Sequence, residues 1–383
     1  MDRIAAHGLT LGVSRRRTGL QAGIAAAENS GMSLPSFSPA LIALSLVTAL
    51  LPVALGLGLM RALRRRQRGD ERTRTRRLAL LMRRHVRRGT PGRVLAEAVS
   101  AATPAEFWSA LEAGVPRLTR AERRRLGGLF ERTDPVAAER HALLFESPLR
   151  RELAARRLGL LPCPRSRRAL RSAIGASPEL VGYAAARSLA RDGDLRSLDW
   201  ALSQPGLLPQ RTARDWAVLL RAFGRGALPR LGDAVRAGIQ DTRVLRAAVE
   251  TLGLGRHAPA AAAIECLVRH TDAEVRVAAV RALGRIATSP NSPVLLEALS
   301  DTAWPVRAQA AWALGRIGLE AAVPALSSCL TDREWWVRRH AAYALAGLGN
   351  RGANVLRVAA NGSPDRYARD IADEALRTLS RSA

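Results

Sequence analysis

The stretch that decides the fold is DAEVRVAAVRALGRI, residues 272–286, because near copies follow at 304–318 (WPVRAQAAWALGRIG) and 335–349 (WWVRRHAAYALAGLG). One arginine and one leucine recur in each copy, and again in a weaker fourth copy, always 31 residues apart. Counted from that arginine, apolar residues occupy positions −1, +3, +6, +7 and +10. This spacing is one stripe of a helix with 3.6 residues per turn, so each copy is predicted to be an amphipathic helix. The repeated residues are Arg276, Arg307, Arg338 and Arg369, and Leu283, Leu314, Leu345 and Leu376.

A shorter apolar helix is predicted before each of these helices, for example over residues 293–300 and 322–330. Two antiparallel helices in about 31 residues cannot bury both apolar faces alone, so neighbouring pairs must stack into one continuous core. Weaker matches to the Leu-Gly column extend the pattern back to residue 135. The sequence therefore predicts an all-α fold, an α-solenoid of about eight helix pairs over residues 135–380, with residues 91–134 as a helical N-terminal cap.

The pattern D-x4-VR-x2-AA-x-ALG-x-I/L resembles the bacterial HEAT-like repeat family of the PBS-lyase type. The same fold serves as the scaffold of phycobilin lyases and of some alkylpurine DNA glycosylases. The resemblance is strongest over residues 270–380, and it is specific for the fold but almost silent on function. It implies that the repeated arginine and an aspartate in the turn tie adjacent repeats together. The residues to which this implied structural role applies are Arg276, Arg307, Arg338, Asp301 and Asp332.

An apolar segment near the N-terminus predicts one membrane-spanning helix, over residues 38–60. No charged residue occurs between Asn29 and Met60, and the 22 residues from Pro39 reach roughly 33 Å as a helix, enough for a bilayer core of about 30 Å. Residues 1–37 show no periodicity and are predicted to be a poorly ordered N-terminus, for which Met1 and Met32 are both compatible translation starts.

A basic juxtamembrane segment, residues 61–90, follows the apolar one. Between Arg61 and Arg88 there are 13 arginines against Asp70 and Glu71. By the positive-inside rule this segment lies in the cytoplasm, which predicts a single-pass protein of the bacterial inner membrane with its N-terminus outside and its solenoid in the cytoplasm. The same arginines are expected to contact anionic lipid head groups, worth about 1 kcal/mol per arginine near the surface.

The composition of the chain limits the kinds of site that it can contain. The formal net charge is +27, and all 60 basic residues are arginine, which is typical of a GC-rich coding sequence and by itself only partial support for an anionic partner. Cys163, Cys266 and Cys329 are far apart and odd in number, so neither a disulfide framework nor a zinc site is indicated. No nucleophile elbow, phosphate-binding glycine loop or dinucleotide fingerprint is present, so we expect no enzyme activity, no metal and no cofactor.

The candidate binding residues lie opposite the apolar stripe, at positions +1, +5 and +9. Stacked helices align these positions as a basic, partly aromatic stripe across one face of the solenoid. Three arginine pairs in this set are four residues apart and cost a few tenths of a kcal/mol each by like-charge repulsion, which an anionic partner would relieve. The alternative interpretation is a solvated face in an arginine-rich protein. The predicted site residues are Arg187, Arg191, Arg221, Arg225, Arg281, Arg285, Trp312, Arg316, Arg339 and Tyr343.

Three hypotheses of function follow. The first is a membrane-anchored scaffold that binds a protein partner with an acidic or membrane-associated surface and has no small-molecule substrate. The second, suggested by the resemblance to HEAT-like glycosylases, is a nucleic-acid-binding or DNA glycosylase-like protein, which the membrane anchor disfavours. The third is a lyase or chaperone for a bound cofactor, suggested by the phycobilin lyases. We expect the first.

Overall fold

The computed structural model describes residue 60 and residues 69–89, 91–176, 178–287 and 292–382. The chain divides into two units, residues 1–73 and residues 74–383. The predicted disordered N-terminus, and the predicted membrane helix except Met60, lie outside the described residues. Among the helices that the structure does describe, none combines the length and the apolar character needed to cross a membrane.

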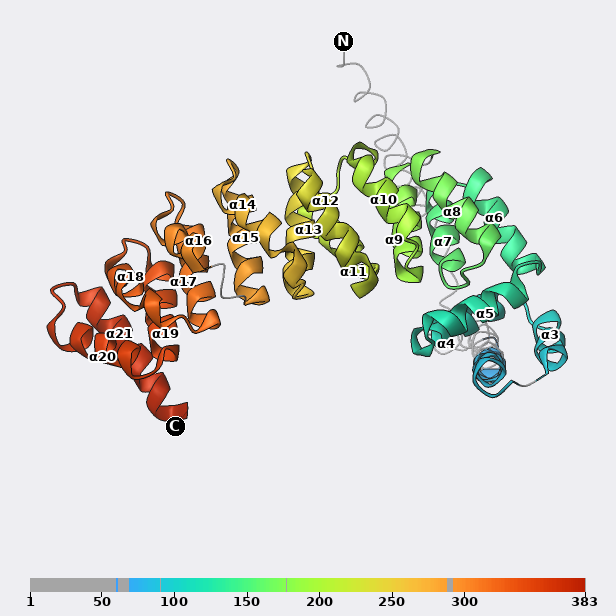
Figure 1. The fold of residues 1–383 in the computed structure, drawn as a ribbon. Helices are drawn as coiled ribbons and strands as arrows, with labels where there is room; N and C mark the ends of the chain where they lie inside the picture. The colour runs from blue at the N-terminus through green and yellow to red at the C-terminus, as the bar shows by residue number, and fades with distance from the viewer. Residues whose placement is uncertain (1–59, 61–68, 90, 177, 288–291, 383) are drawn as a thin grey trace, which may run out of the picture. The chain divides into compact units, whose positions relative to one another are not determined.

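In the described part of the second unit, every regular element is a helix (Figure 1). A helix that ends at residue 88 is followed by α3 (Gly92–Ser100), α4 (Pro104–Gly114) and α5 (Arg120–Phe130). From Asp134 on, the helices alternate as eight pairs. The first helices of the pairs are α6 (Asp134–Phe145), α8 (Pro164–Ala176), α10 (Leu195–Ser203), α12 (Leu228–Ala237), α14 (Ala261–Cys266), α16 (Ser292–Glu297), α18 (Val323–Ser328) and α20 (Gly349–Gly362). The second helices are α7 (Pro148–Leu158), α9 (Glu179–Asp192), α11 (Ala213–Ala222), α13 (Thr242–Leu254), α15 (Ala273–Ile286), α17 (Trp304–Ile317), α19 (Trp335–Gly347) and α21 (Arg366–Ser382).

Short 3-10 helices join these elements or extend their ends. They are η1 (Val115–Arg117), η2 (Pro205–Leu207), η3 (Arg225–Ala227), η4 (Ala258–Ala260), η5 (Leu267–Arg269), η7 (Ala298–Ser300), η8 (Glu320–Ala322) and η9 (Cys329–Thr331). The predicted all-α solenoid of about eight pairs is thus confirmed for the described residues.

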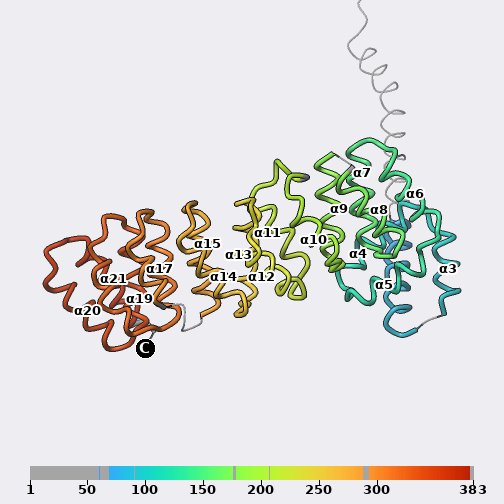
Figure 2. Tube along the Cα trace, turned by 45° about the horizontal axis from the view of Figure 1, so that its top comes forward, coloured from blue at the N-terminus to red at the C-terminus, as the bar shows by residue number. Residues whose placement is uncertain are grey.

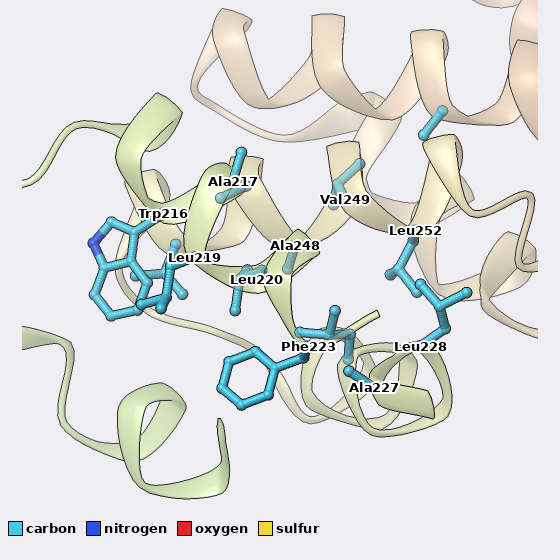
Figure 3. Packing of buried hydrophobic residues seen from close by; sticks show 14 of the residues in the cluster. Trp216, Ala217, Leu219, Leu220, Phe223, Ala227, Leu228, Ala248, Val249 and Leu252 are labelled. Atoms are coloured by element: carbon cyan, nitrogen blue, oxygen red, sulfur yellow. The ribbon is translucent and has the colours of Figure 1, made fainter. Parts of the chain in front are cut away.

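The core runs along the row of second helices, each of which contacts the next from α7 to α21 (Figures 1 and 2). The leucine of each strong repeat, Leu283, Leu314 and Leu345, is fully buried, as an apolar stripe facing a shared core requires. Figure 3 shows part of this packing, where Trp216 and Leu220 of α11 lie with Leu252 of α13 among the buried side chains. Since the row is continuous, no single pair has a core of its own.

A column of glycines sets how closely the second helices approach each other. Gly284 of α15 and Gly315 of α17 lie inside their helices, where an added Cβ atom would come within 2.6 Å of the Cβ atoms of Ala313 and Ala344. Gly318, by contrast, lies just after α17 and ends that helix, with a φ of 78°. At Gly315 the absence of a side chain instead allows α17 to lie close to α19.

The column of arginines ties neighbouring pairs together, as the resemblance implied. Nε and Nη2 of Arg307 donate to the two carboxylate oxygens of Asp332, at 2.8 and 2.9 Å, while Nη1 donates to the carbonyl of Asp301 at 2.8 Å. Arg276 binds Asp301 in the same way, at 2.8 and 2.9 Å. Each of these guanidinium groups joins its own helix to the turn that begins the next second helix.

The third arginine of the column lacks a carboxylate partner. Arg338 donates from Nη1 to the carbonyl of Asp332 at 2.7 Å, but the position 31 residues after Asp332 is Ser363. The buried Nε of Arg338 has no hydrogen-bond partner among the described residues. Its guanidinium carbon lies 5.1 Å from the ring centre of Tyr367, so a cation–π contact replaces the ion pair at the last repeat.

The apolar core continues into the segment before the pairs. The side chains of Phe107, Trp108 and Phe130 are buried, and the Phe107 ring meets the other two edge to face, with centres 5.1 and 5.3 Å apart. Thr103 and Thr119 form capping boxes that fix the starts of α4 and α5.

Two arginines of α5 connect this segment to the ends of later second helices. Nη2 of Arg120 donates to the carbonyl of Phe223 at 2.8 Å, just after α11. Nε of Arg124 donates to the carboxylate of Asp192 at 3.0 Å, and Nη2 donates to the Asp192 carbonyl at 3.0 Å, at the end of α9. Arginines at helix C-termini satisfy free carbonyls and complement the helix dipole.

Replacing Gly315 by alanine is expected to destabilise the chain by about 1–3 kcal/mol, because the new methyl group overlaps Ala344 and α17 and α19 must separate. Gly347→Ala is the matched control, since a Cβ atom there meets nothing within 4 Å. The free energy of unfolding in urea, followed by circular dichroism, measures both changes. Equal stability of Gly315→Ala and the control would contradict the close approach.

The ion pair between Arg307 and Asp332 is expected to make the stability of the fold depend on pH. Burial raises the pKa of Asp332, but hydrogen bonds from Arg307 and the Glu334 backbone outweigh it, so the pKa is below its ordinary value of 3.8. A carboxyl with a depressed pKa stabilises the fold above its ordinary pKa, and this contribution disappears as the pH falls through the lowered value. Asp332→Asn should therefore cost about 2 kcal/mol at neutral pH and progressively less below about pH 4, as measured by urea unfolding. A pH-independent difference would contradict the ion pair.

Candidate partner-binding surface

Three of the predicted arginines line one groove across the second helices α11, α13 and α15. The groove has a volume of about 470 Å³. Arg221 comes from α11, and Arg281 and Arg285 come from α15, so these three predicted arginines line the same groove. The residues of this arginine groove are Ala213, Arg214, Ala217, Arg221, Arg246, Glu250, Glu274, Val277, Ala278, Arg281 and Arg285.

Sequence reasoning missed four charged residues of the arginine groove. Arg214 and Glu274 occupy position −2 and Arg246 position +1 of their helices, while Glu250 stands at +5, in the same column as Arg221 and Arg281. Arg246 donates to Glu274 at 2.6 Å, and Nη1 of Arg221 lies 4.0 Å from Glu250. Since the groove contains five arginines and two glutamates, it carries a surplus of positive charge.

Arg285 is the least satisfied arginine of the groove. Its side chain is half-buried, and its buried Nη1 has no hydrogen-bond partner among the described residues. Burial and the nearby Arg281 lower the pKa of Arg285; Glu250 opposes this, and Arg316 lowers the pKa further. Because burying an uncompensated guanidinium is costly, Arg285 is poised for an anion supplied from outside.

Trp312 and Arg316 continue the surface on α17. The guanidinium carbon of Arg316 lies 5.6 Å from the centre of the Trp312 ring, so these side chains form a cation–π pair. Trp312 is half-buried because its ring packs beside Gly284 of the preceding helix, while Arg316 is exposed. Arg316 is therefore an exposed cation that rests on the Trp312 ring, and that ring is held in place by the preceding helix.

Arg339 and Tyr343 lie on α19, where their groups contact each other and the last helix. The guanidinium carbon of Arg339 lies 5.5 Å from the ring centre of Trp335 and 4.6 Å from that of Tyr343. The hydroxyl of Tyr343 donates to Glu374 of α21 at 2.8 Å, and this hydrogen bond raises the pKa of Tyr343. Their predicted role in partner binding stays a prediction.

Arg187 and Arg191 lie on α9 and are exposed. Burial, then Arg187 and Arg156, lower the pKa of Arg191, which places three like charges near each other on α7 and α9. The position of Arg225 differs from the prediction that it lies on the same helix face as Arg221. Helix α11 ends at Ala222, and Gly224, with a φ of 76°, turns the chain so that Arg225 lies in η3 rather than one turn after Arg221 on the same helix.

No group of three histidine, cysteine, aspartate or glutamate side chains in the described part of the chain could hold a metal ion. Burial raises the pKa of the Cys329 thiol to about 11, with Asp332 adding to the effect and Arg307 opposing it, so this group is a neutral thiol at physiological pH.

Replacing Arg285 by glutamine is expected to leave the fold as stable as before or to stabilise it by a few tenths of a kcal/mol, because like-charge repulsion is removed. The gain should be largest at low salt, where charges are least screened. Arg307→Gln serves as the contrast, since it breaks a two-pronged ion pair and should destabilise. Urea unfolding at two salt concentrations measures both; a destabilised Arg285→Gln would assign Arg285 a structural role.

Comparison with known proteins identifies the repeats. The family model described as HEAT repeats matches residues 228–302 and 292–377. No curated protein sequence matches the chain. The solved structures similar to it include an engineered protein with 18% identity, covering 80% of this chain and 94% of that one, with a TM-score of 0.40.

Two natural proteins are also among the similar structures. YibA of Escherichia coli has 17% identity, covers 73% of this chain and 98% of that chain, and gives a TM-score of 0.37. Kap95p, from a study of its binding to RanGDP, has 15% identity. The match covers 80% of this chain and 50% of that chain, with a TM-score of 0.45. The match to the HEAT-repeat model over residues 228–377 agrees with the resemblance noted above. The bacterial origin and the membrane anchor stay predictions.

Proposed function

We propose that this protein is a membrane-anchored, non-enzymatic scaffold that binds an acidic protein partner along the second helices of its HEAT-like repeats. The observation that carries the proposal is the arginine groove, in which five arginines face two glutamates and one buried donor of Arg285 has no partner in the described residues. Arginine also forms two-pronged bonds with carboxylates, which suits an acidic protein surface.

The arrangement of charge favours a protein over a nucleic acid. Binding to nucleic acid is driven by many phosphate contacts, so an extended positive surface favours it. Here glutamates interrupt the stripe, at Glu250 on α13 and at Glu374 on α21. Trp312 and Arg316, beside the groove, are residue types enriched at the centres of protein interfaces. A mixed surface of this kind fits a partner with local acidic patches.

The membrane part of the proposal comes from the sequence. The apolar segment 38–60 would anchor the chain, and the arginines between Arg61 and Arg88 would hold anionic lipid head groups on the cytoplasmic side of a bacterial inner membrane. The scaffold would then present its repeats to partners at or near that membrane.

Reversing the charge of Arg281, Arg285 and Arg316 to glutamate tests the proposal. In the full chain, extracted gently from membranes and purified, the variant should keep its helical circular dichroism but lose at least about tenfold of the co-purifying partner, because cross-interface attraction becomes repulsion. Increasing salt should weaken the wild-type complex in the same direction.

The matched control reverses three exposed arginines on the first helices, Arg165 and Arg168 on α8 and Arg196 on α10. This control changes the net charge equally and should retain the partner. Retention of the partner by the groove variant, or equal loss in both variants, would rule out the arginine groove as the binding surface.

A further inference from the structure

Three arginines on α15 and α17 form a cluster at one end of the arginine groove. Arg281 and Arg285 line the groove, and Arg316 borders it one repeat further along. The three groups are close enough that both Arg281 and Arg316 lower the pKa of Arg285, and Glu250 is the acidic group that opposes them. The α15–α17 arginine cluster therefore holds three positive charges against one negative charge.

Each member of the cluster is held in position by the protein. Nε of Arg281 donates to the side-chain oxygen of Gln309 on α17 at 3.1 Å, which leaves its terminal nitrogens for another acceptor. Arg316 rests on the ring of Trp312, with 5.6 Å between guanidinium carbon and ring centre. Arg285 is half-buried between them and has the unpartnered Nη1. The donors are thus ordered before any ligand arrives, which lowers the entropy lost on binding.

The same helices show what a satisfied arginine looks like in this fold. Arg276 on α15 and Arg307 on α17 each bind both oxygens of an aspartate. Arg281 and Arg285, one and two turns further along α15, have no carboxylate bonded to them among the described residues. Arg276 and Arg307 thus have carboxylate partners within the protein, whereas in the described part of the chain Arg281 and Arg285 do not. An anion from outside the protein can therefore bind to this cluster.

We propose that Arg281, Arg285 and Arg316 bind a phosphate monoester carried on a side chain of the protein partner. This inference rests on the proposed function and adds the chemical group that the partner presents. A phosphorylated side chain carries about −1.5 to −2 charges at neutral pH and three acceptor oxygens, which matches a surplus of two positive charges and several ordered donors. A single carboxylate supplies half that charge. A phosphodiester also supplies one charge per group, and a long polyanion would meet Glu250 and Glu274 in the adjoining groove.

Binding of a labelled peptide to the full chain in mild detergent tests the proposal. The probe is a short glycine–serine peptide with one central phosphoserine, and the matched peptides carry serine or glutamate at that place. Fluorescence polarisation should show binding of the phosphopeptide at least about tenfold tighter than that of the glutamate peptide, because charge-assisted hydrogen bonds to a dianion are stronger. Inorganic phosphate should compete with the phosphopeptide.

Variants locate the site. Two single variants, Arg285→Gln at the half-buried arginine and Arg316→Gln at the exposed one, should each weaken phosphopeptide binding about tenfold. Arg285→Lys keeps the charge but loses the planar two-pronged donor, so it should recover only part of the affinity. Arg196→Gln, at an exposed arginine on α10, is the control and should bind as the wild type does.

Three results would overturn the phosphate site. Equal binding of the phosphoserine and glutamate peptides would leave only a general acidic preference, with the proposed function intact. Tighter binding of a single-stranded oligonucleotide, lost in Arg285→Gln, would assign the cluster to nucleic acid instead. Absence of phosphopeptide binding to the wild type would also reject the site, while the co-purification experiment judges the scaffold independently.

Discussion

The close approach of the second helices is the constraint on which the rest of this structure depends. Gly284 and Gly315 face alanines of the next helix, so that backbones rather than long side chains set the spacing of α15, α17 and α19. Small residues on both sides of such a contact allow dense packing of a narrow apolar stripe. Gly253 makes the same close approach to Ala282, so α13, α15 and α17 each use this contact with the next helix. Each side-chain position therefore recurs at the same place on these successive helices and forms a column on the surface.

Two neighbouring columns of arginine have opposite consequences. The column of Arg276 and Arg307 is paired with aspartates of the turns and holds the register of the pairs. The cluster of Arg281, Arg285 and Arg316 is left with few acceptors, and Arg285 is partly desolvated without a bonded carboxylate. Ion pairs are therefore concentrated on one edge of the second helices, while the arginines without bonded carboxylates among the described residues lie on the adjoining face, where we propose that the partner binds.

The sequence alone predicted the repeat architecture well, because a 31-residue period and an apolar stripe depend only on local spacing. It also placed Arg221, Arg281 and Arg285 on one side. It could not place Arg225, since the end of α11 is decided by the turn at Gly224 rather than by the period. Nor could it foresee that Arg246 is bonded to Glu274, because that pairing depends on the offset between helices.

The contacts of α5 impose an order on folding. Within the repeats, ion-paired partners such as Arg307 and Asp332 are 25 residues apart, whereas Arg120 reaches a carbonyl 103 residues further along the chain. At about 5–20 residues per second, the ribosome delivers that acceptor roughly 5–20 s after Arg120 itself. The leading helices therefore emerge first, and Arg120 and Arg124 cannot form these hydrogen bonds until the residues that end α9 and α11 have been synthesised.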